Sequence, residues 1–501
     1  MMDNNQREVS GTPRGERVFG LTLTAAVLAV ILIVNVLIYV LNVNLGIFYV
    51  VPTTTTQTAL SDALDTKFAD AESKGAKVNI TFCMAEDELE ASSVGSRVFD
   101  TANKFVEKYP ELIEINHVNI IVEKPKIQKY IDAGYKILKN TVIIESGENI
   151  RVLTDSSSSL GFVDFFTTDS DGNEESYEGE TVFAGMISWV LSSSHPKAYL
   201  TTGHSEQIDP AFSLILTAAG YTVDLVNLSK EAVPSDCDLL IIATPKNDFE
   251  TSAEGSQIPY VLTETGRLEA YLKSGGNLYV SLDPYIGKLS SLEGVLATCG
   301  MKLAENTEGG KSVRGIVKDE TGGIRDAYTV VTEHSDNDIA AAIGNTVGNY
   351  NDGSVVVRFA GAIALDKGAK PIVESSETSV LVNGTEVVDS EGGYAVAAYN
   401  KITLEGGTGE ATVFLTSSLY LTVTSAVITN GYSNRDFTYA VFEHLFGREG
   451  LPYGCTSNVY DNQMLENLTL GATRLYTVLA LVPPMLIAVA GAVIVIRRKN
   501  R

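Results

Sequence analysis

The chain has 501 residues, of which 45% are hydrophobic, and a formal net charge of −25 at pH 7. This length suits one large domain or two to three ordinary ones. Because affinity for a nucleic acid comes mostly from Lys and Arg, the acidic charge excludes DNA and RNA as expected partners. The first 17 residues sum to zero and the last five to +4, so the residues between them carry −29.

Both ends carry an uncharged apolar stretch that predicts a transmembrane helix. Residues 18–41 contain 24 residues without a charge, and residues 475–496 contain 22, whereas a bilayer core needs about 20 helical residues. No A-x-A-like cleavage motif follows the first stretch, which is also longer than the core of a signal peptide. We therefore expect two uncleaved anchors, the second kinked at Pro483 and Pro484.

The charges that flank these stretches predict their orientation. The second is followed at once by the basic residues 497–501, whereas residues 42–66 and 449–473 contain no Lys or Arg. By the positive-inside rule, residues 1–17 and 497–501 form cytoplasmic tails, and the main body is extracytoplasmic at the cell membrane. Two buried core helices in a soluble protein are the weaker alternative.

The first part of the body predicts a small α/β domain. Residues 42–75 combine a Thr-rich lead-in with an amphipathic helix. Residues 76–194 then predict the order β-α-β-(α)-β-β-α, which is thioredoxin-like in outline, with a hairpin around "SGEN" at residues 146–149. The C-x-x-C pair of that fold is missing, so we expect no redox role. The four cysteines lie far apart and leave their disulfide state open.

Residues 195–447 predict a second, larger α/β domain, followed by a linker at 448–474. Strands alternate with helices, and the strands are almost continuously apolar, which is typical of a parallel sheet covered on both faces. The expected strands begin with "AYLTTG", "TVDLVNL", "DLLIIATP" and "NLYVSLDP". Further strands, "SVVVRFAGAIAL", "SVLVNG", "YAVAAYN" and "EATVFLTSS", are expected to extend the same sheet with an insertion, before a closing helix "FTYAVFEHLFG".

Polar residues follow three of the predicted parallel strands. Because ligands bind at the carboxyl ends of strands in open α/β sheets, these residues could line one crevice. The expected ligand-binding residues are Gly203, His204, Ser205, Glu206, Asp248 and Asp283. A structural interpretation competes with this one: Gly203 opens a turn, Ser205 or Glu206 caps or neighbours a helix N-terminus, and the two aspartates are turn or cap residues.

Known catalytic motifs fail at these positions. A nucleophile elbow needs G-x-S-x-G, but residue 207 is Gln. A phosphate loop ending at "GKS" needs Gly at position 305, where the chain has Glu. The five histidines show no metal-ligand spacing. We therefore expect no catalytic residues, no metal and no cofactor, and we keep a hydrolase using His204 and Ser205 as an alternative.

Several segments together resemble one known family. They are the "GE" at 179–180 before a helix, the strand end "TTGHSEQ" at 201–207, "PSDCDLLIIATPKNDF", "LEAYLKSGGNLYVSLDP", and "SNRDF" at 433–437. The chain resembles GldG-like proteins, the gliding-motility-type auxiliary components of ABC transport systems, along nearly its whole length. Ser205 departs from the family's "TGHGE" signature, because it replaces the second Gly.

The resemblance implies a fold and a set of partners. It implies a glutamine-amidotransferase-like, flavodoxin-like α/β domain without the nucleophilic Cys of those enzymes. It also implies a separate ABC ATPase subunit and a polytopic permease subunit as partners. We expect a non-catalytic, membrane-anchored extracytoplasmic auxiliary subunit of an ABC-type transport complex, recognising or scaffolding at the outer face. The alternatives are a membrane-anchored surface hydrolase and a module that binds an extracellular carbohydrate or peptide.

Overall fold

The computed structural model describes residues 60–459 apart from 63, 93, 154–164, 169–173, 252–258, 325, 336–338, 340–353, 430 and 456. The predicted transmembrane helices at 18–41 and 475–496 and the predicted cytoplasmic tails lie outside the described residues. Within the described part of the chain, no helix has both the length and the apolar character needed to cross a bilayer.

A four-stranded sheet occupies the first part of the described chain. Its order is β2-β1-β3-β4, with β1 parallel to β2 and antiparallel to β3, and β4 antiparallel to β3. The strands are β1 (Val78–Phe82), β2 (Ile113–His117), β3 (Val142–Ser146) and β4 (Asn149–Leu153). The predicted hairpin is therefore confirmed, because β3 and β4 pair across the turn at "SGEN".

Five helices accompany this sheet in the described chain: α2 (Asp65–Ser73), α3 (Glu86–Ala91), α4 (Gly95–Lys108), α5 (Lys124–Asp132) and α6 (Gly179–Val190). The amphipathic α4 buries Val98, Ala102 and Phe105, as its spacing predicts. Around α6 lie the short strands β5 (Phe166–Thr168), β6 (Glu174–Tyr177) and β24 (Asn458–Val459), which pair in the order β24-β6-β5. The last of these comes from the far end of the described chain.

The second part contains an eight-stranded mixed sheet in the order β16-β19-β22-β23-β10-β9-β7-β8. Its parallel strands are β8 (Thr222–Val226), β7 (Lys197–Thr201), β9 (Leu239–Ala243), β10 (Asn277–Ser281) and β23 (Ala411–Thr416). Its antiparallel strands are β22 (Ala395–Ile402), β19 (Lys370–Glu374) and β16 (Glu333–His334). The prediction of an α/β protein with a mostly parallel sheet is confirmed.

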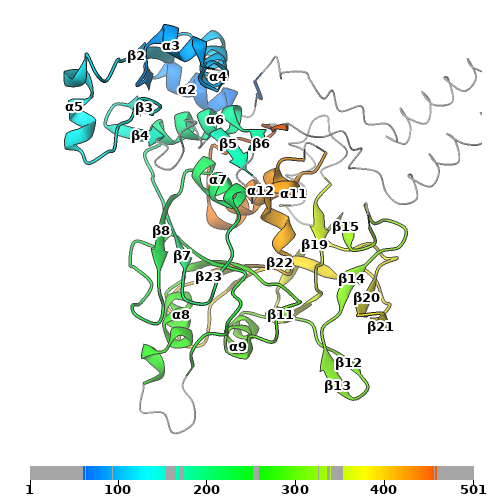
Figure 1. Cartoon of the computed structure of the whole chain (residues 1–501). Coiled ribbons are helices and arrows are strands. Elements are labelled where there is room, and N and C mark those ends of the chain that lie inside the picture. The colour runs from blue at the N-terminus through cyan, green and yellow to red at the C-terminus, as the bar shows by residue number, and fades with distance from the viewer. Residues whose placement is uncertain are drawn as a thin grey trace, which may run out of the picture. The chain divides into compact units, whose positions relative to one another are not determined.

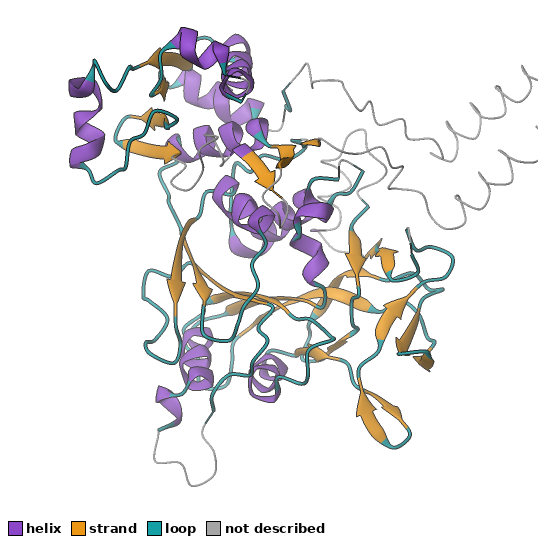
Figure 2. Cartoon of the chain, in the orientation of Figure 1, coloured by secondary structure: helices purple, strands orange, loops and turns teal. Residues whose placement is uncertain are grey.

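Helices cover both faces of this sheet (Figures 1 and 2). On one face lie α7 (Pro210–Ala218) and α12 (Asn434–Phe446), and on the other lie α8 (Glu264–Lys273) and α9 (Ser290–Thr298). Every residue of β9 is buried: Leu239 and Ile241 pack on the α7 and α12 side, and Leu240 and Ile242 on the other. This double burial explains why β9 is continuously apolar.

Two of the strands expected to extend the large sheet pair elsewhere. The segment 354–365 divides into β17 (Val356–Arg358), which pairs with β15 (Thr329–Val331), and β18 (Ile363–Leu365), which pairs with β11 (Met301–Leu303). Between them Phe359 has a φ of 50°, a left-handed conformation that interrupts an extended strand. The prediction that this segment extends the sheet is therefore wrong.

The segment "SVLVNG" is also outside the large sheet. Its strand β20 (Val380–Asn383) pairs with β14 (Ile316–Lys318) and β21 (Glu386–Asp389) in a separate three-stranded sheet. A hairpin of β12 (Asn306–Glu308) and β13 (Lys311–Val313) precedes it. The remaining short elements are η2 (Tyr260–Leu262), η4 (Leu419–Thr422) and α11 (Thr424–Val427).

Candidate functional site

The strand order places the segment after β7 at a topological switch point. The strands β7 and β9 are neighbours, and the chain continues from β7 to β8 on one side but from β9 to β10 on the other. Ligands of such sheets bind at the carboxyl ends of the two strands where the direction reverses. Gly203 has a φ of 119°, and a Cβ there would lie 3.2 Å from the side-chain nitrogen Nδ2 of Asn227. Gly therefore fits this turn better than any residue with a side chain.

His204 follows Gly203 and is buried, with 6% of its surface exposed. Its Nε2 lies 2.9 Å from Oε2 of Glu264, and its Nδ1 lies 3.3 Å from Oε1 of Glu206. Its ring stacks on Phe249 at a centroid distance of 4.1 Å. Both ring nitrogens are therefore occupied by carboxylates.

The two acids control the protonation of His204. Burial lowers the pKa of His204, but the hydrogen bonds to Glu206 and Glu264 outweigh burial, and the net pKa is raised. Burial raises the pKa of Glu206, but its bond to His204 and the N–H groups that it accepts lower it overall. Both carboxylates thus favour the imidazolium form of His204, as in a structural ion-pair cluster.

The side chain of Ser205 bonds to Asn247. The residue is exposed, has a φ of 57°, and its Oγ accepts a hydrogen bond of 3.3 Å from Nδ2 of Asn247. A serine nucleophile needs a neighbouring base with a free ring nitrogen. Here the imidazole nitrogens bond to Glu206 and Glu264, and Ser205 bonds to Asn247.

The expected helix cap is a different residue. The side chain of Asp209 accepts the N–H of Ala211 at 2.9 Å and caps α7. It also accepts the N–H of Thr424 at 3.0 Å. Neither Ser205 nor Glu206 is the cap itself: Glu206 lies four positions before Pro210, the first residue of α7, and accepts the N–H of His204 instead.

Asp248 and Asp283 have structural roles. Asp248 accepts the N–H groups of Ser291 and Leu292, at 2.8 and 3.1 Å, in the first turn of α9. Asp283 accepts the N–H of Tyr285 at 2.8 Å and orders the turn after β10. These are the turn and cap roles that the sequence offered as the alternative to ligand binding.

The six predicted residues therefore divide into two places. Gly203, His204, Ser205 and Glu206 lie together, with Asp248 on the neighbouring loop whose Asn247 contacts Ser205. Asp283 instead begins a loop that forms one wall of a separate cavity. The sequence offered no signal for Glu264, because an acid in the first turn of a helix is also the ordinary choice for the helix dipole.

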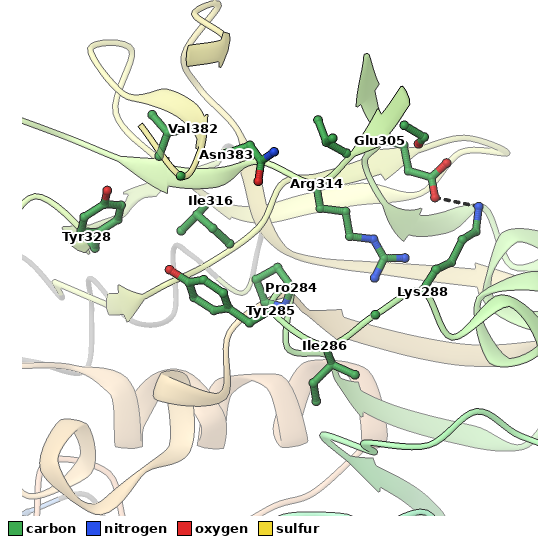
Figure 3. Close-up of a pocket in the computed structure, with 14 residues that line it drawn as sticks. Pro284, Tyr285, Ile286, Lys288, Glu305, Arg314, Ile316, Tyr328, Val382 and Asn383 are labelled. Atoms are coloured by element: carbon green, nitrogen blue, oxygen red, sulfur yellow. Dashed lines mark ion pairs between the residues drawn. The ribbon is translucent and has the colours of Figure 1, made fainter. Parts of the chain in front are cut away.

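This cavity has a volume of about 500 Å³ (Figure 3). Three segments line it: the loop at 284–288 after β10, residues 312–316 at β13 and β14, and the β20–β21 turn at 382–384, with Tyr328 and Glu305 at its sides. The close-up shows Tyr285 and Ile286 on the loop, opposite Ile316 and Val382. Its walls thus combine aromatic and aliphatic side chains.

Two cations line the cavity among these apolar groups. Lys288 pairs with Glu305 at 2.6 Å. Arg314 donates through Nη2 to both carboxylate oxygens of Glu293, at 2.5 and 2.7 Å. The side chains of Arg314 and Glu293 are 12% and 4% exposed. The sequence carried no signal for this site, because its walls come from segments about 100 residues apart.

The four cysteines are free thiols, with Cys83, Cys299 and Cys455 buried and Cys237 half-buried. Burial raises the pKa of Cys237 to about 11, so its thiol is a poor nucleophile. In the described part of the chain, no three His, Cys, Asp or Glu side chains gather as a metal site would need.

A buried ion pair joins the "SNRDF" segment to the residue directly before the "GE" at 179–180. Arg435, within "SNRDF", donates to Glu178, directly before α6, at 2.8 Å, and their side chains are 5% and 0% exposed. Arg435 also donates to the hydroxyl of Thr181 and the carbonyl of Cys455. These bonds fasten α12, α6 and the last described segment to one another.

The first and last described segments meet at this junction. The hydroxyl of Ser61 donates to the carbonyl of Tyr453 at 2.8 Å. The hydroxyl of Ser188, on α6, donates to the carbonyl of Gly450 at 2.6 Å and accepts from Lys67 Nζ at 2.7 Å. Residues 61–67 and 450–455 therefore lie side by side on α6.

No family model matches the sequence, and no curated protein matches it. Several solved structures are distantly similar over half of this chain. The mmIFT52 N-terminal domain has a TM-score of 0.36 and 14% identity, over 50% of this chain and 98% of its own.

Two bacterial proteins show the same level of similarity. A ThuA-like protein from Bacteroides uniformis has a TM-score of 0.31 and 13% identity, over 50% of this chain and 91% of its own. A glutamine amidotransferase from Thermotoga maritima has a TM-score of 0.28 and 11% identity, over 50% and 99%. These similarities assign neither a family nor a function, and the GldG-like resemblance stays a prediction.

Proposed function

We propose that this chain is a non-catalytic, membrane-anchored extracytoplasmic subunit of an ABC-type transport complex. The observation that carries the proposal is the meeting of residues 61–67 and 450–455 on α6. Ser61 follows the first predicted span by 20 positions, and Cys455 precedes the second by 20. The described residues nearest to the two predicted spans in the sequence thus lie side by side, which supports attachment of the body at one place.

A paired attachment suits a subunit better than a freely moving receptor. A receptor domain needs only one anchor, whereas two adjacent spans offer a helical surface for a polytopic partner. The buried pair Arg435–Glu178 strengthens the junction where those anchors would attach. A movement of the partner subunit would then be transmitted to the body through the junction of α6 and α12.

The state of His204 supports the non-catalytic part of the proposal. Its ring nitrogens bond to Glu264 and Glu206, which argues against His204 as the base of the hydrolase alternative. That alternative predicts covalent labelling of the protein by a fluorophosphonate probe, lost in Ser205→Ala. We expect the wild-type chain and Ser205→Ala to be equally unlabelled.

The main experiment is a pull-down of the full-length tagged chain from native membranes in a mild detergent. We expect to recover a nucleotide-binding subunit and a polytopic permease in fixed ratio. The control carries an unrelated apolar helix of equal length in place of residues 475–496, and it should recover less of the permease. Recovery of neither subunit with the wild-type chain would refute the proposal.

A further inference from the structure

We propose that the cavity after β10 binds a small organic molecule carrying one carboxylate. The carboxylate lies at Arg314 and Lys288, and the apolar body of the ligand packs against Tyr285 and Tyr328. This inference goes beyond the proposed function, because a transport subunit needs no ligand of its own. It also places recognition away from the His204 cluster.

The size and walls of the cavity suit an organic ligand. Its volume of about 500 Å³ falls within the roughly 300–1,000 Å³ that is usual for small-molecule sites. Tyr285 is 62% exposed although it is a large aromatic residue. It packs edge-on against Phe359 at 5.5 Å, and Phe359 also contacts Tyr328. The aromatic wall is therefore held in place while one side stays open to a ligand.

Arg314 is the group that points to an anion. It is largely buried, and Glu293 engages only its Nη2. Among the described residues, no acceptor bonds to its Nε or Nη1. A partly buried guanidinium with unused N–H groups is suited to a carboxylate, because charge-assisted hydrogen bonds are strongest away from water. Lys288 approaches the same space from the opposite loop (Figure 3).

The neighbouring acids limit the charge of the ligand to one. Glu305 forms an ion pair with Lys288, and Glu293 forms an ion pair with Arg314. A dianion such as a phosphate monoester would be repelled by both acids at short range. The protein as a whole carries −25, which further disfavours a highly charged anion.

The site is organised before a ligand arrives. Glu293 accepts the N–H of Leu289 at 3.0 Å while it holds Arg314, so one carboxylate fixes both the end of the loop and the guanidinium. Asp283 fixes the start of the same loop through Tyr285. Binding of a ligand would therefore lose little conformational entropy in ordering these side chains.

The test uses the full chain in detergent micelles and a matched pair of probes. N-acetylphenylalanine carries the carboxylate, and N-acetylphenylalaninamide has the same body without the charge. Isothermal titration calorimetry should give saturable binding of the acid, at least tenfold tighter than the amide. Equal binding of acid and amide, or no binding of the acid, would overturn the proposal.

Three variants make the result specific to the site. Arg314→Lys keeps the charge beside Glu293 but loses the planar donor group, and it should weaken the acid at least tenfold. Glu305→Gln removes a negative charge from the cavity and should tighten the acid severalfold, a gain that misfolding cannot produce. Glu320→Gln is the matched control, because Glu320 pairs with Lys318 at 2.6 Å outside the cavity, and it should leave the affinity unchanged. An unchanged affinity in Glu305→Gln would contradict the proposal.

Two further probes distinguish the sources of the carboxylate. Phenylacetate represents a free organic acid, and the tripeptide Ala-Ala-Phe represents a peptide C-terminus. Tighter binding of the tripeptide than of phenylacetate would assign the site to peptide ends, and the reverse order would assign it to free acids. Binding of phenyl phosphate more tightly than any carboxylate would refute the charge argument.

Discussion

Arg435 and Glu178 form a buried ion pair although 257 positions separate them in the sequence. Both side chains are almost fully removed from water. Charges in that position are retained only when they are paired and hydrogen-bonded, and Arg435 meets this condition through Thr181 and Cys455. The pair joins α6 to α12 at the junction of the first and last described segments.

Breaking this pair should strongly destabilise the body. We expect Arg435→Met to lower the free energy of unfolding by about 3–5 kcal/mol, because it leaves Glu178 buried without its counter-charge. The double variant Arg435→Met, Glu178→Met should recover most of that loss. Urea unfolding followed by the fluorescence of Trp189, the chain's single Trp, measures this. Lys74→Ala, which removes an exposed pair with Asp70, is the control and should cost less than about 1 kcal/mol.

Asp436 should make stability depend on pH in the acidic range. Burial raises its pKa from 3.8 to about 6, against the opposing effects of the Gly454 N–H and Arg435. Because the folded state holds the proton more tightly than the unfolded state, stability should fall as the pH rises from about 4 to about 6. The expected loss is about 3 kcal/mol.

The variant Asp436→Asn isolates this effect. It keeps an acceptor for Gly454 but cannot ionise, so the loss between pH 4 and pH 6 should become smaller. Unfolding free energies measured at half-unit intervals of pH provide the comparison. Asp70→Asn, on the exposed surface, should retain the wild-type pH profile. An identical profile for Asp436→Asn and the wild type would contradict the prediction.

His204 should contribute stability that is lost at higher pH. Its folded-state pKa lies above the ordinary value of 6.5, because Glu206 and Glu264 outweigh burial. The stabilisation by the imidazolium is therefore complete below pH 6.5 and disappears as the pH rises through the folded-state pKa.

The variant His204→Gln tests this role. It should destabilise the protein by about 3 kcal/mol at pH 6, because it leaves buried carboxylates without a cation. The difference from the wild type should shrink as the pH rises through the folded-state pKa of His204. His444→Gln, at the last turn of α12, serves as the histidine control. A pH-independent difference for His204→Gln would assign His204 a packing role instead.

The predicted topology can be tested by labelling intact cells. The native cysteines are largely buried, so the background with a membrane-impermeant maleimide should be low. Lys311→Cys, at an exposed position on β13, should react without lysis, whereas Ser10→Cys should react only after lysis. Reaction of both, or of neither, before lysis would contradict the predicted orientation.

Local patterns in the sequence determined the elements of this protein. The continuous apolar run of β9 predicted a strand buried on both faces, and the "SGEN" turn predicted the β3–β4 hairpin. The position of Gly203 at the end of an apolar strand predicted a turn at the edge of the sheet. These features depend on residues close together in the chain, whose spacing follows from the periods of helices and strands.

Only the tertiary structure decided which distant segments meet. In the structure the apolar strands β17 and β20 pair outside the large sheet, because an apolar run predicts that a strand is buried but not which strand it pairs with. It brings Glu264 to His204 and Arg435 to Glu178. It also encloses the cavity between the loop at 284–288 and the turn at 382–384. Such contacts arise from the packing of whole elements, and no local spacing encodes them.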